Sequence, residues 1–145
     1  MKVKDILANK GGDVITISKD TAILESMAIF SKNRVGSLLI MEGDKILGII
    51  AARDVLMAVL NHLDEIKTLT VDKIMTTDLV VGTADDKVDY IQAIMTENRI
   101  RHVPILDGNK LIGLVSIGDV VKAQLKEQHV ENRYLKDYIA DKYPG

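Results

Sequence analysis

The chain repeats itself, and this repeat constrains its fold more than any other feature. With an offset of 65 residues and no gap, residues 14–60 align with residues 79–125, and 13 of the 47 pairs are identical. Some identical pairs, such as Gly43 and Gly108, stand where turns are expected. Self-similarity at a fixed period indicates repeated structural units, each too small to bury its apolar surface alone. We therefore expect two copies of one unit, packed together as a pseudo-twofold pair.

Each copy is predicted to form a helix, a strand, a helix, a β-hairpin and a final helix. Apolar residues recur at helical spacing in some segments, and short apolar runs flank Gly-containing turns in others. Asp20 and Thr21 are the candidate caps of the first long helix. The first copy is expected to have helices at 3–7, 20–33 and 52–63 and strands at 14–17, 38–41 and 45–50. The second is expected to have helices at 71–75, 85–98 and 117–128 and strands at 79–81, 102–106 and 110–116.

This order predicts an α/β fold of two β-α-β-β-α repeats with an extra C-terminal helix. We expect a first repeat at 1–63, a connector at 64–70 and a second repeat at 71–129. The tail at 130–145 has no counterpart in the repeat. Its apolar pairs at i, i+4 spacing indicate a helix that packs on the pair or on a partner.

The composition excludes several classes of function. The chain of 145 residues has a net charge of −2, scattered Lys and Arg, and only four Tyr and one Phe as aromatic residues, so a nucleic-acid-binding face is not expected. It contains no Cys, which excludes disulfides and thiolate metal sites. Neither a signal peptide nor an apolar run of membrane-spanning length is present. We expect a soluble cytoplasmic protein that binds neither nucleic acid nor membrane.

One heptad combines groups that could hold a ribose-phosphate. In residues 113–119, Gly-Leu-Val-Ser-Ile-Gly-Asp, a strand leads to a hydroxyl at Ser116 and an acid at Asp119 as a helix begins. Helix starts favour anions, and a carboxylate can accept hydrogen bonds from sugar hydroxyls. The same spacing is close to an ordinary capping box, and on one heptad alone capping is the favoured interpretation. A second copy, residues 48–54, stands in the same context and shifts the balance toward a binding site.

The tandem unit, closing twice on this heptad pattern, resembles a pair of cystathionine-β-synthase (CBS) domains. Nearly the whole chain is covered by the resemblance. It implies a regulatory module that binds AMP, ADP, ATP, S-adenosylmethionine or a dinucleotide in clefts between the repeats. It also implies a homodimer, arranged head-to-head or head-to-tail, that acts on a regulated protein not identified by the sequence.

The resemblance implies one cleft built around the second heptad. There Asp119 would hold the ribose hydroxyls and Ser116 would contact ribose or phosphate. Thr16 would touch the nucleotide, and the backbone of the first repeat's hairpin start would border the adenine. The residues of that border are Val35, Gly36 and Ser37.

A mirror cleft would use the first heptad and the equivalent parts of the second repeat. Ala51 stands where Ser116 stands in the other copy, so the hydroxyl is missing, although Arg53 could supply charge beside Asp54. This difference predicts unequal clefts. The remaining residues of the mirror cleft are Val81, Arg101, His102 and Pro104.

No catalytic arrangement and no metal-ligand spacing occurs among the three His and the acidic residues. We therefore expect a protein that is not an enzyme, requires no cofactor or metal, and binds an adenosine ligand non-covalently. Two other classes stay open from the sequence. One is a ligand-free interaction module whose function is the dimer surface, and the other is a small enzyme acting on the nucleotide.

Overall fold

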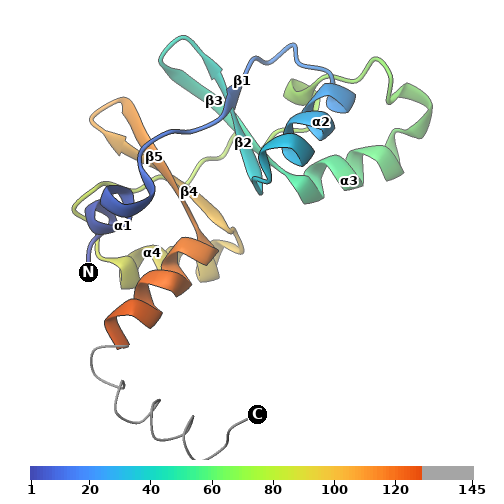
Figure 1. The fold of residues 1–145 in the computed structure, drawn as a ribbon. Helices are drawn as coiled ribbons and strands as arrows, with labels where there is room; N and C mark the ends of the chain where they lie inside the picture. Colours follow the sequence, from blue (N-terminus) through green and yellow to red (C-terminus); the bar gives the residue numbers. More distant parts are fainter. Residues whose placement is uncertain (129–145) are drawn as a thin grey trace, which may run out of the picture.

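A computed structural model describes residues 1–128, and the expected C-terminal helical tail lies outside them. Its helices and strands are drawn in Figure 1. The first half contains α1 (Val3–Lys10), β1 (Thr16–Ile17), α2 (Ile23–Asn33), β2 (Ser37–Glu42), β3 (Lys45–Ala51), α3 (Ala52–Asn61) and the 3-10 turn η1 (Leu63–Glu65). The second contains the 3-10 turn η2 (Val71–Lys73), α4 (Val88–Asn98), β4 (His102–Asp107), β5 (Lys110–Ser116) and helical residues 117–128.

The two predicted hairpins are confirmed, and they share one register. Antiparallel β2 and β3 turn through Gly43, and β4 and β5 turn through Gly108, both with φ of +61°. Glycine adopts this left-handed conformation without a steric penalty, which suits a two-residue hairpin turn. Each hairpin shifts register at the same place, after Ile40 in the first and after Ile105 in the second. The repeat in the sequence is therefore a repeat in the backbone.

The structure corrects the start of both long helices. Helix α2 begins at Ile23 rather than at Asp20, and α4 begins at Val88 rather than at residue 85. Neither start has a side-chain cap. Before α2 the backbone bonds instead to the end of the connector and the start of the second repeat, since Ala22 bridges Thr70 and the Thr21 carbonyl accepts from the Val71 N–H at 2.9 Å. This long-range backbone pairing replaces the capping that the local pattern predicts.

The expected strands before these helices were also too long. Only Thr16 and Ile17 remain of the first, which pairs parallel to β2. Residues 79–81 form no strand, and the equivalent pairing is a single bridge between Gly82 and Ile105. The helix expected at 52–63 ends at Asn61 and is followed by η1.

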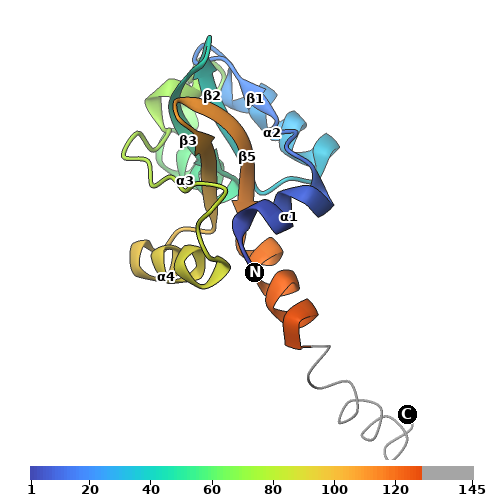
Figure 2. The same cartoon turned by 90° about the vertical axis from the view of Figure 1, so that its left-hand side faces the viewer.

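Each core incorporates the leading segment of the other repeat. Val3 and Ile6 of α1 are buried in the core of the second repeat, and Val71 is buried in the core of the first. Helix α1 accordingly packs against β5 at the opposite end of the sequence (Figures 1 and 2). The two repeats therefore interlock, because neither completes its core with its own residues.

Two equivalent glycines make room for these crossing segments. A Cβ atom added to Gly113 would lie 2.5 Å from Cδ2 of Leu7, and one added to Gly48 would lie 2.7 Å from Sδ of Met75. Real Cβ atoms do not approach so closely, so the strands need glycine where the other repeat's segment crosses. Within residues 1–128, no helix is long and apolar enough to cross a membrane.

Candidate ligand-binding site

The second heptad forms the joint between β5 and the final helix. The Ser116 N–H donates to Oδ2 of Asp119 at 2.9 Å, and the Asp119 N–H donates to Oγ of Ser116 at 3.1 Å. This reciprocal pair is a capping box in the geometric sense, so the capping interpretation describes the local structure correctly. It leaves Oδ1 of Asp119 without a hydrogen bond from any residue in 1–128. The carboxylate can therefore cap its helix and still accept from a ligand.

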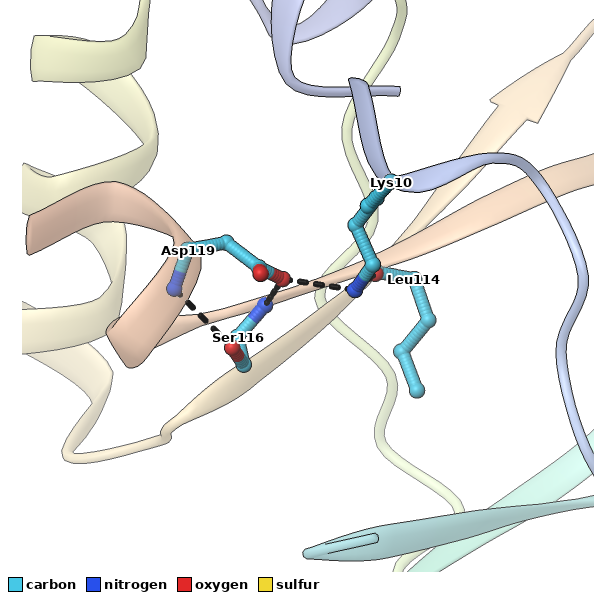
Figure 3. A network of polar contacts seen from close by, with 4 residues as sticks. All are labelled: Lys10, Leu114, Ser116 and Asp119. Atoms are coloured by element: carbon cyan, nitrogen blue, oxygen red, sulfur yellow. Dashed lines mark hydrogen bonds and ion pairs between the residues drawn. The ribbon is translucent and has the colours of Figure 1, made fainter. Parts of the chain in front are cut away.

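A lysine from the first repeat reaches this carboxylate. The Nζ atom of Lys10 donates to Oδ2 of Asp119 at 2.6 Å and to the Leu114 carbonyl at 2.8 Å (Figure 3). Lys10 is the last residue of α1, which crosses to the second repeat. Sequence reasoning missed Lys10, because only the crossing of α1 brings it to the site.

The environment keeps Asp119 charged. Burial alone would raise the pKa of its carboxyl group, but the hydrogen bonds from Lys10 and from the Ser116 N–H outweigh burial and hold that pKa below its ordinary value. The Asp119 side chain is 21% exposed, so it remains accessible from one side. The site thus presents an ionised acceptor beside an ammonium group.

The two hairpin starts meet where the repeats join. A Cβ atom on Gly36 would lie 2.9 Å from Nε2 of His102, so this imidazole rests on the Gly36 backbone. The carbonyl of Gly36 accepts from the Ala52 N–H at 3.3 Å, and the carbonyl of Arg101 accepts from the Ile117 N–H at 2.8 Å. The structure therefore brings together two of the residues implied for opposite clefts, Gly36 and His102.

The environment of His102 favours its neutral form. Burial lowers the pKa of its imidazole, the Lys10 charge lowers it further, Asp119 opposes the shift, and Arg101 adds to it. These groups connect the repeat junction electrostatically to the Lys10–Asp119 pair. Arg101 itself is exposed at the start of β4.

The other implied residues of the Asp119 cleft lie at the start of the first hairpin or on β1. Thr16 is exposed as the first residue of β1, and Val35 is half-buried before β2. Ser37 is buried at the start of β2, and its hydroxyl has no hydrogen-bond partner among residues 1–128. None of these three contributes to the cavity at Asp119 described below.

The mirror cleft differs as its sequence indicates. Oδ2 of Asp54 accepts from the Ala51 N–H at 2.7 Å, but Ala51 has no hydroxyl to return the bond. No ion pair among residues 1–128 involves Asp54 or the exposed Arg53. Val81 is 43% exposed, and Pro104 is buried in β4 with its carbonyl accepting from the Gly82 N–H. Asp54 therefore lacks both the hydroxyl and the cation that accompany Asp119.

A cavity of about 360 Å³ opens at Asp119, between α1 and the final helix. Its walls are partly apolar and carry three lysines, none of which sequence reasoning assigned to a binding site. The lining residues are Met1, Ile6, Asn9, Lys10, Asp119, Lys122, Ala123 and Lys126. Within residues 1–128, no group of three His, Asp or Glu side chains gathers as a metal site would require.

Comparison with known proteins places the chain in a family. The CBS domain family model matches residues 3–61 and 71–126. The mitochondrial CBS domain-containing protein CBSX3 of Arabidopsis thaliana is 32% identical, with 97% of this chain and 73% of that protein aligned.

Solved structures agree in fold. The CBS-domain containing protein ATU1752 from Agrobacterium tumefaciens matches with a TM-score of 0.83 and 34% identity, over 86% of this chain and 99% of that one. The CBS domain pair of protein MJ0100, solved in complex with 5′-methylthioadenosine and S-adenosyl-L-methionine, matches with a TM-score of 0.75 and 28% identity, over 85% and 98% of the two chains. Two interlocked repeats, two family matches and these relatives lead to one conclusion: the chain belongs to the CBS domain family and is a tandem CBS domain pair.

Proposed function

We propose that this CBS pair is a regulatory, non-catalytic module that binds an adenosine-containing ligand at Asp119. The observation that carries the proposal is the ionised carboxylate of Asp119, with one oxygen unused by residues 1–128, facing a cavity beside the Lys10 ammonium. The ribose hydroxyls would donate to that oxygen. The MJ0100 CBS pair, which was solved with two adenosyl compounds, supports this class of ligand.

The interlocked fold could convert ligand binding at Asp119 into a change in how the two repeats are attached. Lys10 comes from the first repeat's leading helix, whereas Asp119 belongs to the second repeat. A ligand between them contacts both repeats at once and strengthens their attachment. A ligand that binds one arrangement of the two repeats more tightly than another shifts the conformational equilibrium toward the first.

We infer that the response is delivered through a homodimer to a regulated protein still to be identified. Helices α2 and α3 expose large apolar side chains that one pair leaves in solvent. They are Leu24, Met27, Leu56, Met57 and Leu60, and Leu63 follows α3. The second repeat exposes Tyr90, Val121 and Leu125. Helices α2 and α3 contact each other, and large apolar side chains exposed on neighbouring helices are typical of protein interfaces.

Thermal unfolding tests the ligand. Protein that has been unfolded, stripped of small molecules and refolded should melt at a higher temperature with AMP, ADP, ATP or S-adenosylmethionine. A ligand present at about 100 times its dissociation constant adds roughly 2.7 kcal/mol to the stability of the folded state. Melting curves unmoved by all four compounds at millimolar concentration contradict the proposal.

A ligand-free interaction module is the second candidate. It is favoured by the contacts that Asp119 already makes, since the carboxylate caps its helix and pairs with Lys10 without a ligand. On that alternative the exposed apolar helices are the functional surface. Stabilisation by an adenosine compound, lost in an Asp119 variant, decides against it. A cytoplasmic location stays a prediction, and the A. thaliana relative is named as mitochondrial.

A further inference from the structure

The cavity at Asp119 extends away from the carboxylate along one face of the final helix. Asp119, Lys122 and Lys126 stand at i, i+3 and i+7, a spacing that places side chains on the same helical face. All three line the cavity, and Asn9 and Lys10 line its opposite wall. The cavity is therefore a groove with the ribose-binding candidate at one end and lysines along its length.

The charges of this groove do not balance. Lys10 is paired with Asp119, and the amino group of Met1 is paired with Glu127 at 2.7 Å. The ion pairs formed among residues 1–128 include neither Lys122 nor Lys126. Both side chains are exposed, so they add two positive charges to the lining that no described carboxylate neutralises.

The equivalent face of the first repeat lacks these lysines. At the 65-residue offset, Lys122 corresponds to Met57 and Lys126 to Asn61. The two lysines of the groove therefore have no counterpart beside Asp54. Because the two repeats share one fold, a feature present in only one of them is not required by that fold.

We propose that the groove binds the phosphate chain of an adenosine di- or triphosphate, with Lys122 nearest the ribose and Lys126 at the far end. This assignment rests on the proposed function, because it takes Asp119 as the ribose end of the same ligand. Seven residues of helix rise about 10 Å, so a single phosphate next to the ribose does not reach Lys126, whereas a longer chain does. S-adenosylmethionine carries a sulfonium cation in place of the phosphates, and the lysines disfavour it.

The lysines also determine how the binding responds to salt. Both are solvent-exposed, so their attraction for phosphate is screened as ionic strength rises. The advantage of ATP over adenosine should therefore shrink at high salt. Contacts at Asp119 are shared by both ligands and do not account for such a difference.

Titration calorimetry on the full chain tests the assignment. The probes are adenosine, AMP, ADP, ATP and S-adenosylmethionine, without added divalent cations, at low and high salt. We expect the dissociation constant to fall along the series from adenosine to ATP by about tenfold or more, since exposed lysine contacts each contribute a few-fold. S-adenosylmethionine should bind more weakly than ADP and ATP.

A matched pair of variants separates the groove from general charge effects. Lys122→Gln with Lys126→Gln should weaken ATP binding about tenfold and leave adenosine binding unchanged. Lys32→Gln with Lys73→Gln removes the same charge from exposed positions outside the cavity, and should leave both unchanged. Equal affinity for adenosine and ATP, S-adenosylmethionine binding as tightly as ATP, or normal ATP binding by the groove variant overturns the assignment but leaves the proposed function standing. Failure of every adenosine compound to bind overturns both.

Discussion

Lys10 donates from its Nζ atom to Oδ2 of Asp119 at 2.6 Å, although 109 positions separate the two residues in the chain. The same ammonium donates to the Leu114 carbonyl at 2.8 Å, so one side chain ties the end of α1 to both β5 and the final helix. The pair joins the first repeat to the second at the wall of the cavity. It is therefore both a structural link and part of the candidate site.

Lys10→Met should lower the free energy of unfolding by about 1 kcal/mol, near the upper end for exposed ion pairs, because Asp119 is only 21% exposed. Chemical denaturation measures the loss. Lys10→Arg keeps the positive charge and should recover part of it. Equal stability of the wild type and Lys10→Met would show that the pair contributes nothing to holding the repeats together.

The two heptads should contribute unequally to ligand binding. Asp119→Ala should weaken the tighter binding phase by about one to two decades, since a hydrogen bond to a charged group is worth roughly 1.5–3 kcal/mol. Asp54→Ala is the equivalent change in the other repeat. It also removes a helix-capping carboxylate, but Asp54 has neither the hydroxyl nor the lysine that accompany Asp119. It should leave the tighter phase nearly intact in calorimetry. A larger loss from Asp54→Ala would assign the tighter site to the other cleft.

Stability should fall as the pH drops below about 7, and His102 should account for part of the fall. Burial and the Lys10 and Arg101 charges hold its pKa in the folded protein below the ordinary value of 6.5, against the opposing Asp119 charge. Below that value the unfolded chain takes up a proton that the folded protein resists. The contribution of His102 is therefore complete above about pH 7 and is lost progressively on acidification.

Unfolding free energies measured between pH 7.5 and about pH 5 test this expectation, a range set by the titration of histidine. His102→Gln should flatten the dependence over this interval. His62→Gln, at an exposed residue just after α3, is the control and should keep it. Identical pH profiles for wild type and His102→Gln would exclude a role for this imidazole. Asp119, whose pKa is held low, adds a further loss only at more acidic pH.

Gly48→Ala should destabilise the fold by about 1–3 kcal/mol, the usual cost of overpacking a core. The new Cβ atom would lie 2.7 Å from Sδ of Met75 and 2.9 Å from the Thr76 carbonyl oxygen. Met75 can move, but the Thr76 carbonyl is fixed by the Ile49 N–H. Gly118→Ala is the control, because a Cβ atom added there meets nothing closer than 3.6 Å. Since alanine is favoured over glycine in a helix, this variant should raise the free energy of unfolding by about 0.5–1 kcal/mol. Loss of stability in both variants would point to a general effect of replacing glycine.

The exposed apolar face should hold two copies together. We expect a sedimentation mass of twice the 16.0 kDa chain for the wild type. Leu56→Glu with Leu60→Glu should yield the single-chain mass, because Leu56 is 59% and Leu60 is 68% exposed, so neither is needed inside the fold. Val81→Glu, at an exposed apolar residue outside α2 and α3, should remain dimeric. A wild-type mass equal to one chain at micromolar concentration would exclude the dimer.

Local features of the sequence were sufficient to predict the two repeats, the hairpins and the strand–helix joints at the heptads. Hairpin turns at Gly43 and Gly108 and the apolar runs beside them are encoded by neighbouring residues, and the repeat at a fixed offset reported the number of units. The Ser116–Asp119 spacing also predicted the joint correctly, because a capping box is formed within one turn of helix. The CBS family followed from these features together.

Tertiary structure alone decided where α2 and α4 begin and that Lys10 lies beside Asp119. Helix α2 starts late because Ala22 pairs with Thr70, a contact that no local pattern reports. Lys10 reaches Asp119 because α1 packs on the second repeat, where Gly113 leaves space for Leu7. Short-range signals in the sequence specify turns, caps and periodicity, whereas contacts between the repeats depend on how distant segments fill one core.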